Sequence, residues 1–229
     1  MSVASALAGV KARIDAAARA AGRDPSSVKL VAVSKTHGPE TMREAYAAGQ
    51  RAFGESYAQE LVEKAEALVD LPDLEWHFVG HLQTNKAKYV ARVAHLVHAV
   101  HSRELAAELG KRAASAGRAP LAVLVEVKLS DEATKHGVSR PDLPALLDAI
   151  ERDARLRLRG LMTMPPPGDL AAARRVFEEL VQLRDRNGGA ARLPELSMGM
   201  TDDFETAVAC GATIVRVGTA IFGPRASAP

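Results

Sequence analysis

Short apolar runs alternate with helical segments along almost the whole chain of 229 residues. Each run has the length of a strand and is rich in Val, Leu, Ile or aromatic residues. The runs are Lys29–Lys35, Arg51–Gly54, Glu75–Gly80, Leu96–Val100, Leu121–Val127, Arg157–Thr163, Glu195–Gly199 and Ile214–Gly218. The segments with helical periodicity are Pro39–Ala48, Tyr57–Val69, Arg103–Ala116, Pro141–Ile150, Asp169–Arg186 and Asp202–Cys210. An additional alanine-rich helix is expected over Val3–Ala21, before the first strand.

Eight strands that alternate with helices predict an α/β chain folded as a single (β/α)8 TIM-type barrel, with the extra N-terminal helix outside it. No linker divides the chain, so residues 1–229 are predicted to form one domain. A doubly wound open sheet is the alternative. The sequence after the first strand, Thr36–Pro39, holds one glycine and lacks the Gly-x-Gly-x-x-Gly pattern of that fold.

Composition narrows the classes of function. The formal net charge is only +2, which gives no electrostatic reason for a nucleic-acid or membrane-surface partner. No window has the apolar length of a membrane helix, and the N-terminal segment carries charges throughout, unlike a secretory signal. The one cysteine, Cys210, excludes an internal disulfide and fits a reducing compartment, so a cytoplasmic protein is predicted.

Lys35 stands at the end of the first predicted strand, where β/α barrels place their working residues. Strand alternation puts Val31, Val33 and Lys35 on one face. If that face points inward, the ammonium lies above an apolar layer, which favours the neutral amine that Schiff-base formation requires. A lysine that simply ends a strand in solvent is the alternative reading.

Two glycine-containing loops follow the last two strands. Ser197–Thr201 and Gly218–Gly223 each combine glycines with a hydroxyl at the start of a predicted helix. The loops after strands seven and eight are where β/α barrels frequently bind phosphate. Together they predict a phosphate site, although either could be a capped turn.

Arg216 is predicted to point into the barrel, because alternation places Val215 and Val217 on the opposite, helix-facing side. A buried guanidinium needs a partner, either a polar ligand or a carboxylate such as Glu126. A lysine, a phosphate site and an arginine at one barrel mouth indicate a phosphorylated aldehyde as ligand. Pyridoxal 5′-phosphate (PLP) and a sugar phosphate held by a Schiff-base aldolase both satisfy this pattern.

Eight motifs in order make the chain resemble the PLP homeostasis protein family, small barrels related to the N-terminal domain of alanine racemase. The motifs are Val31–Thr36, Phe53–Glu55, Trp76–Gly80, Leu82–Lys86, Ser130–Lys135, Gly160–Met162, Leu196–Met200 and Arg216–Gly223. The resemblance implies a protein that holds PLP as a Schiff base on Lys35 and stores and delivers it within the cell. The other cofactor contacts that it implies are Ser197, Gly199, Gly218 and Thr219 at the phosphate and Arg216 at the pyridine nitrogen.

The chain departs from the family pattern at two positions. Ser56 stands where family members usually have asparagine, and His81 where proline is common. Both make the surroundings of the cofactor ring different from those of relatives. The segment Ser130–Lys135 either closes over the cofactor or shapes a loop.

The same resemblance favours a carrier over an enzyme. PLP chemistry is strongest when the pyridine nitrogen is protonated opposite a carboxylate, and Arg216 cannot accept a proton. Alanine racemases add a second domain and a tyrosine base, whereas this sequence ends at Pro229, and its tyrosines fall in early predicted helices. We therefore expect no enzyme activity beyond a weak side reaction; a PLP-dependent amino-acid racemase is the alternative.

The expected partners are PLP and, transiently, PLP-dependent apoenzymes, with the chain itself a monomer. An RNA-binding barrel that uses Lys86, Lys88 and Arg92 is a third reading, but helical spacing puts these charges on a solvated face as readily. The histidines form no recognised metal spacing, and no metal site is predicted.

Overall fold

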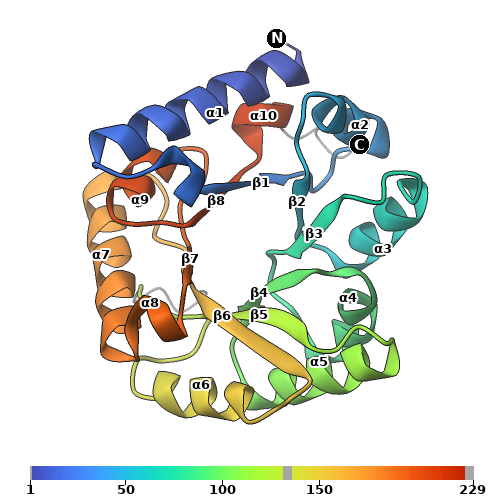
Figure 1. The fold of residues 1–229 in the computed structure, drawn as a ribbon, viewed down its shortest axis with the longest axis vertical. Helices are drawn as coiled ribbons and strands as arrows, with labels where there is room; N and C mark the ends of the chain where they lie inside the picture. The colour runs from blue at the N-terminus through green and yellow to red at the C-terminus, as the bar shows by residue number, and fades with distance from the viewer. Residues whose placement is uncertain (1, 131–135, 225–229) are drawn as a thin grey trace.

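Parallel strands close into a barrel in the order β1 to β8 in the computed structural model, which describes residues 2–130 and 136–224 (Figure 1). The strands are β1 (Lys29–Val33), β2 (Ala52–Glu55), β3 (Glu75–Phe78), β4 (Leu96–Val100), β5 (Leu121–Glu126), β6 (Leu156–Met162), β7 (Glu195–Ser197) and β8 (Ile214–Val217). The barrel closes where β1 pairs with β8, with Val31 opposite Arg216. The predicted TIM-type barrel and its eight strands are confirmed.

Helices surround the barrel as an outer ring (Figure 1). They are α1 (Val3–Ala20), α2 (Pro39–Ala47), α3 (Ala58–Ala67), α4 (Ala87–Val93), α5 (Arg103–Ser115), α6 (Leu143–Glu151), α7 (Leu170–Arg186), α8 (Gly189–Arg192), α9 (Phe204–Ala209) and α10 (Thr219–Phe222), with 3₁₀ turns at Pro25–Ser27 and Thr84–Lys86. The extra N-terminal helix is confirmed as α1. No bounds were predicted for α4, α8 and α10, because segments of four to seven residues show too few turns to establish a period.

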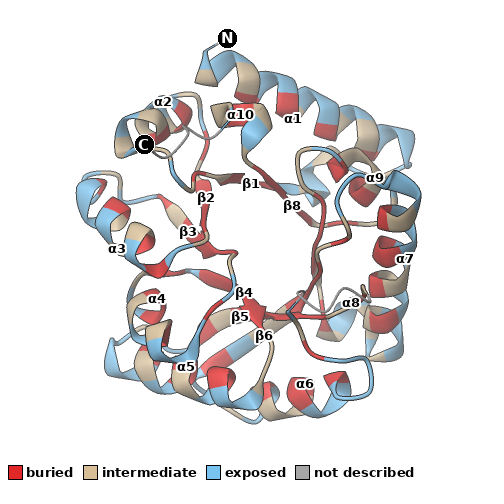
Figure 2. Ribbon diagram, turned by 180° about the vertical axis from the view of Figure 1, so that it is seen from behind, coloured by how far each residue is buried: buried red, intermediate tan, exposed pale blue. Residues whose placement is uncertain are grey.

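Alternating strand residues form two apolar layers, which appear as the buried strands of Figure 2. The residues that face outward pack with the helices in the larger cluster, as Ala32, Val215 and Val217 do. The residues that face inward form a small cluster in the barrel. Its members are Val31, Ala52, Leu96, Ala99, Leu124, Met162 and Ile214. This inner cluster is interrupted by polar side chains, which are described below.

The first strand ends earlier than predicted. β1 stops at Val33, and the chain then turns, with the His37 amide donating to the Ser34 carbonyl at 3.0 Å and Thr36 adopting a φ of 67°. This left-handed conformation is unusual for a β-branched residue. Lys35 therefore lies in the first residues of a loop rather than in the strand.

Candidate functional site

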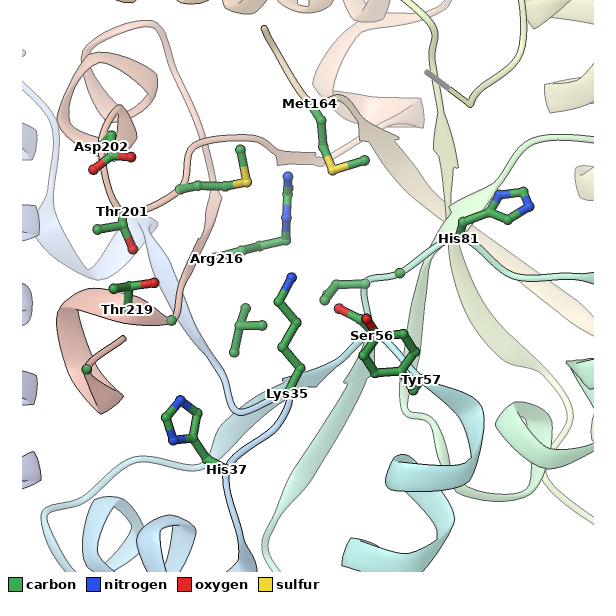
Figure 3. Close-up of a pocket in the computed structure, with 16 residues that line it drawn as sticks. Lys35, His37, Ser56, Tyr57, His81, Met164, Thr201, Asp202, Arg216 and Thr219 are labelled. Atoms are coloured by element: carbon green, nitrogen blue, oxygen red, sulfur yellow. The ribbon is translucent and has the colours of Figure 1, made fainter. Parts of the chain in front are cut away.

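A cavity of about 520 Å³ opens at the carboxyl ends of the strands (Figure 3). Its volume is within the range of small-molecule sites. The lining residues are Val33, Lys35, His37, Ser56, Tyr57, Val79, Gly80, His81, Met164, Met200, Thr201, Asp202, Arg216, Gly218, Thr219 and Gly223. They come from β1 and β8 themselves and from the loops after β1, β2, β3, β6, β7 and β8, so the fold gathers distant segments into one site.

Lys35 and Arg216 both line this cavity, and their side chains project into it (Figure 3). Lys35 is half-buried above Val33, while Arg216 is buried with only 3% of its surface exposed. Strand alternation accounts for both positions, because Val31 faces the barrel interior and Val215 and Val217 face the helices.

Burial lowers the pKa of the Arg216 guanidinium to about 10, a shift that the nearby carboxylates Glu126 and Asp203 partly oppose. The group therefore stays charged at neutral pH. Its Nη1 donates to the Ser197 hydroxyl at 2.6 Å, and its Nη2 donates to the Thr163 carbonyl at 3.2 Å. Hydrogen bonds to these two polar groups, rather than a direct ion pair with Glu126, hold the guanidinium in place.

The loops after β7 and β8 present two hydroxyl side chains to the cavity. Thr201 and Thr219 face the same region of it, on the opposite side of Lys35 from Ser56 (Figure 3). Gly218 completes this part of the lining, and a Cβ atom there would lie 3.0 Å from the Val33 carbonyl oxygen. A side chain at residue 218 would require the neighbouring backbone of β1 to shift by a few tenths of an ångström, so glycine suits this close approach.

Ser197 and Gly199 lie outside the lining of the cavity. Ser197 is fully buried at the end of β7, and its hydroxyl contacts His98 and Arg216 inside the barrel. Gly199 is buried at a φ of 94°, and a Cβ atom there would lie 2.6 Å from the Cβ of Ala207. Thr201, four residues after Ser197, is the hydroxyl that reaches the cavity. Alternation along β7 turns the Ser197 side chain into the barrel interior, where it contacts His98 and Arg216. The hydroxyl that lines the cavity therefore comes from the loop after β7.

A buried ion pair fixes the backbone on both sides of Lys35. Lys64 donates to Glu55 at 2.7 Å, to the Ser34 carbonyl at 2.8 Å and to Glu60 at 2.9 Å. The Ser34 hydroxyl donates to Glu55 at 2.6 Å, and the Thr36 amide donates to Glu60 at 2.9 Å. Burial raises the pKa of the Glu55 carboxyl, and the Lys64 ammonium opposes that rise.

The wall opposite the threonines contains both departures from the family pattern. Ser56 and His81 line the cavity, and Gly80 packs so closely on Ser56 that a Cβ atom would lie 2.3 Å from the Ser56 carbonyl oxygen. The His81 ring stacks on His136, with centroids 3.6 Å apart, and on His101 at 5.0 Å. A histidine here therefore extends an aromatic stack from the cavity across the barrel mouth.

Other predictions fall away from the cavity or outside the described chain. The residues Asp131–Lys135 of the segment Ser130–Lys135 are not among those that the structure describes. Lys86 and Lys88 lie over the ring of Tyr89, at 5.7 and 4.8 Å from its centroid. Within residues 2–130 and 136–224, no group of three metal-ligating side chains is arranged to hold a metal ion. In the same residues, no helix has the length and apolarity that a membrane crossing needs.

Acidification is expected to destabilise the fold below about pH 6.5. Burial lowers the pKa of both His77 and His98, so these rings stay neutral when folded but bind protons when unfolded. Their contribution is complete above the unfolded pKa and is lost as pH falls, by up to about 1.4 kcal/mol per pH unit for each ring. Urea unfolding at pH 7.5 and 5.5 measures this, and an unfolding free energy that does not fall with pH would contradict it.

Comparisons with known proteins agree with this geometry. Residues 6–226 match the family model of the alanine racemase N-terminal domain. A protein of Pseudomonas aeruginosa called pyridoxal phosphate homeostasis protein is 48% identical over 225 residues, covering 97% of this chain and 96% of that protein. One of the same name from Escherichia coli K12 is 42% identical and covers 97% of each chain.

A solved structure of PipY from Synechococcus elongatus, with PLP bound, superimposes with a TM-score of 0.83 at 39% identity. The match covers 96% of this chain and all of PipY. The names of the two relatives above describe homeostasis proteins rather than an enzyme. The chain therefore belongs to the alanine racemase N-terminal domain family and, within it, to the pyridoxal phosphate homeostasis proteins.

Proposed function

We propose that residues 1–229, as one barrel domain, bind PLP as a Schiff base on Lys35 and serve to store and deliver the cofactor inside the cell. When bound, PLP supplies an aldehyde that condenses with a primary amine and a ring that withdraws electrons. The observation that carries the proposal is the cavity itself, where the Lys35 amine, the Arg216 cation and two threonine hydroxyls line one space. PLP bound to PipY, which is 39% identical to this chain, supports the choice of PLP over a sugar phosphate.

The residues of the cavity fit the different parts of this ligand. Thr201, Gly218 and Thr219 would bind the phosphate, with hydroxyl donors and a close backbone. Arg216 would face the pyridine nitrogen and, being charged and a donor only, would keep that nitrogen unprotonated. Lys64, paired with Glu55, would hold the backbone next to Lys35 in place through its hydrogen bond to the Ser34 carbonyl.

An unprotonated pyridine nitrogen weakens the ring as an electron acceptor, which supports a carrier rather than an enzyme. We further propose that the protein works as a cytoplasmic monomer that transfers PLP to apoenzymes by transient contact. The single cysteine supports the cytoplasmic location, because it fits a reducing compartment.

Replacing Thr201 and Thr219 together by valine is expected to weaken PLP binding by about tenfold or more, because two hydrogen bonds are lost and each contributes about 0.5–1.5 kcal/mol net. Binding of pyridoxal, which lacks the phosphate, should change little. Titration followed by absorbance measures both ligands. Thr84→Val, at an exposed position outside the cavity, is the matched control. An equal loss for PLP and pyridoxal would contradict the phosphate assignment.

A further inference from the structure

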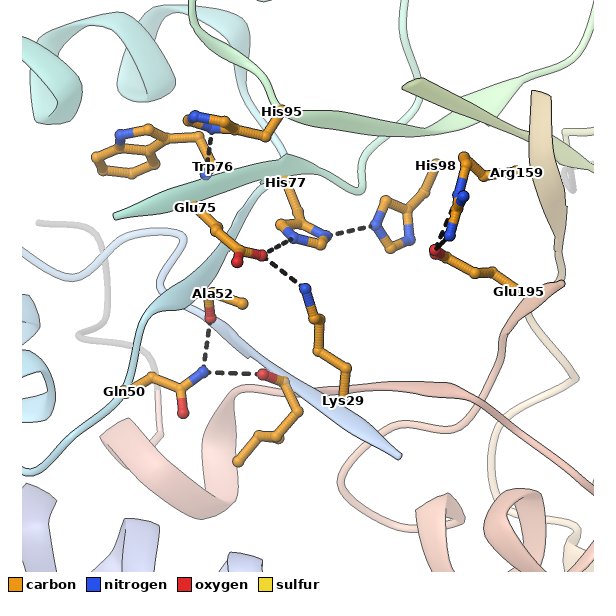
Figure 4. A network of polar contacts seen from close by, with 11 residues as sticks. Lys29, Gln50, Ala52, Glu75, Trp76, His77, His95, His98, Arg159 and Glu195 are labelled. Atoms are coloured by element: carbon orange, nitrogen blue, oxygen red, sulfur yellow. Dashed lines mark hydrogen bonds and ion pairs between the residues drawn. The ribbon is translucent and has the colours of Figure 1, made fainter. Parts of the chain in front are cut away.

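A chain of polar contacts runs through the barrel interior from one end to the other. At the end opposite the cavity, Glu75 accepts from Lys29 at 2.7 Å and lies 3.6 Å from Nε2 of His77 (Figure 4). Nδ1 of His77 lies 2.9 Å from Nε2 of His98, and Nδ1 of His98 lies 2.8 Å from the hydroxyl of Ser197. Ser197 then contacts Arg216 at 2.6 Å, and Arg216 lines the cavity.

The register of the strands builds this chain. His77 lies two residues after Glu75 on β3, so both face inward. On β4, the pairing with β5 shifts between Val97 and Val100, and His98 within this segment points into the barrel. The interior of such a barrel is ordinarily filled by bulky aliphatic side chains.

The two ends of the chain fix the direction of its hydrogen bonds. The guanidinium of Arg216 can only donate, and the Glu75 carboxylate can only accept, because His77 and the Lys29 ammonium hold its pKa at about 2. Ser197 therefore accepts from Arg216 and donates its own proton to Nδ1 of His98. His98 in turn donates from Nε2 to Nδ1 of His77, whose Nε2–H points toward Glu75.

The reverse direction leaves two groups unsatisfied. If His98 donated from Nδ1 to Ser197, His77 would have to donate from Nδ1, and its bare Nε2 would face the Glu75 carboxylate. The Ser197 hydroxyl would then accept two donors and have no acceptor for its own proton among these groups. Burying such groups without partners is costly, so the neutral Nε2–H form is favoured for both rings.

His77, His98 and Ser197 do not line the cavity, and the proposed binding of PLP does not use them directly. Their exposed fractions are 2%, 0% and 0%. Burying these polar groups costs their hydration free energy, and the barrel also lacks the apolar packing that aliphatic side chains would provide there. The consequence of this arrangement is that the Ser197 Oγ atom has a fixed orientation and accepts a hydrogen bond from the guanidinium of Arg216.

We propose that His98 is a positioning residue for Arg216: by accepting the Ser197 proton, it directs the Ser197 oxygen at the guanidinium and holds that cation facing the cavity. The effect on the cofactor rests on the proposed function, but the orientation of the hydrogen bonds does not. Two measurements therefore separate the two claims.

The first measurement needs no cofactor. Nitrogen-15 NMR of histidine-labelled, ligand-free wild-type protein at pH 7.5 should show His77 and His98 as neutral rings protonated at Nε2. A proton on Nδ1 of His98, or a charged His98, would overturn the proposal whether or not the protein binds PLP.

The second measurement compares two variants that differ in which ring nitrogen they replace. His98→Asn puts an acceptor oxygen near the former Nδ1 and keeps the contact to Ser197, whereas His98→Gln reaches the Nε2 position and loses it. We expect PLP affinity and absorption maximum to stay near wild type in His98→Asn, and the affinity to fall about tenfold in His98→Gln with a shifted maximum. Equal behaviour of the two folded variants, at equal thermal stability, would overturn the positioning role. Failure of the wild type to bind PLP would instead refute the proposed function.

Discussion

Lys35→Met is expected to lower the affinity for PLP by about hundredfold, equivalent to about 3 kcal/mol, and to remove the long-wavelength absorption band of the bound cofactor. Methionine keeps a similar length and apolar bulk but cannot form the carbon–nitrogen bond to the aldehyde. The phosphate contacts proposed for Thr201 and Thr219 are untouched, so weak binding should persist. Absorbance titration of the variant and wild type measures both quantities.

Lys111→Met is the matched control, because Lys111 is exposed on α5 and does not line the cavity. An unchanged absorption band in Lys35→Met, with wild-type affinity, would contradict the assignment of the amine. Alanine racemisation is assayed on the same proteins. Sustained racemisation by the wild type that is lost in Lys35→Met would favour the racemase alternative over a carrier.

Lys64→Met is expected to lower the free energy of unfolding by about 3–5 kcal/mol, since it removes one partner of a buried ion pair. Glu55 has no exposed surface, and Lys64 is 6% exposed. Without the ammonium, the Glu55 carboxylate loses its charged partner, while the Ser34 carbonyl and Glu60 lose a donor. Urea unfolding at pH 7.5 measures the loss.

The control for this prediction is Lys29→Met. The Lys29–Glu75 pair has a similar length of 2.7 Å, but its side chains are 49% and 45% exposed. Solvent screens such a pair, so its loss should cost about 0–1 kcal/mol. Similar losses in the two variants would show that burial does not decide the contribution of the Lys64 pair.

Strand periodicity was sufficient to predict the barrel and the inward direction of the Lys35 and Arg216 side chains. Alternation along the first strand places Lys35 on the same face as Val31 and Val33, and alternation along the last strand places Arg216 opposite Val215 and Val217. Both predictions depend only on local register, and both side chains line the cavity. The end of β1 was misplaced by two residues, because the turn depends on tertiary hydrogen bonds to Ser34 and Thr36 rather than on local preference.

The polar interior was not predicted. His77 and His98 are 21 residues apart in the sequence and on different strands, so no spacing rule links them. Alternation places His98, like Leu96 two residues before it, on the inner face of β4, but it does not show which partner the ring meets there. Lys64 resembles any charged residue of an amphipathic helix until the packing of α3 on the barrel brings it to Glu55.

The most direct test of the account is borohydride reduction of wild-type protein loaded with PLP, followed by mass mapping of its peptides. We predict a yellow protein whose visible band disappears on reduction, with the added cofactor mass on the peptide that contains Lys35. A protein that stays colourless with PLP and carries no added mass on Lys35 would contradict the central claim. The cavity would then have to bind a different ligand.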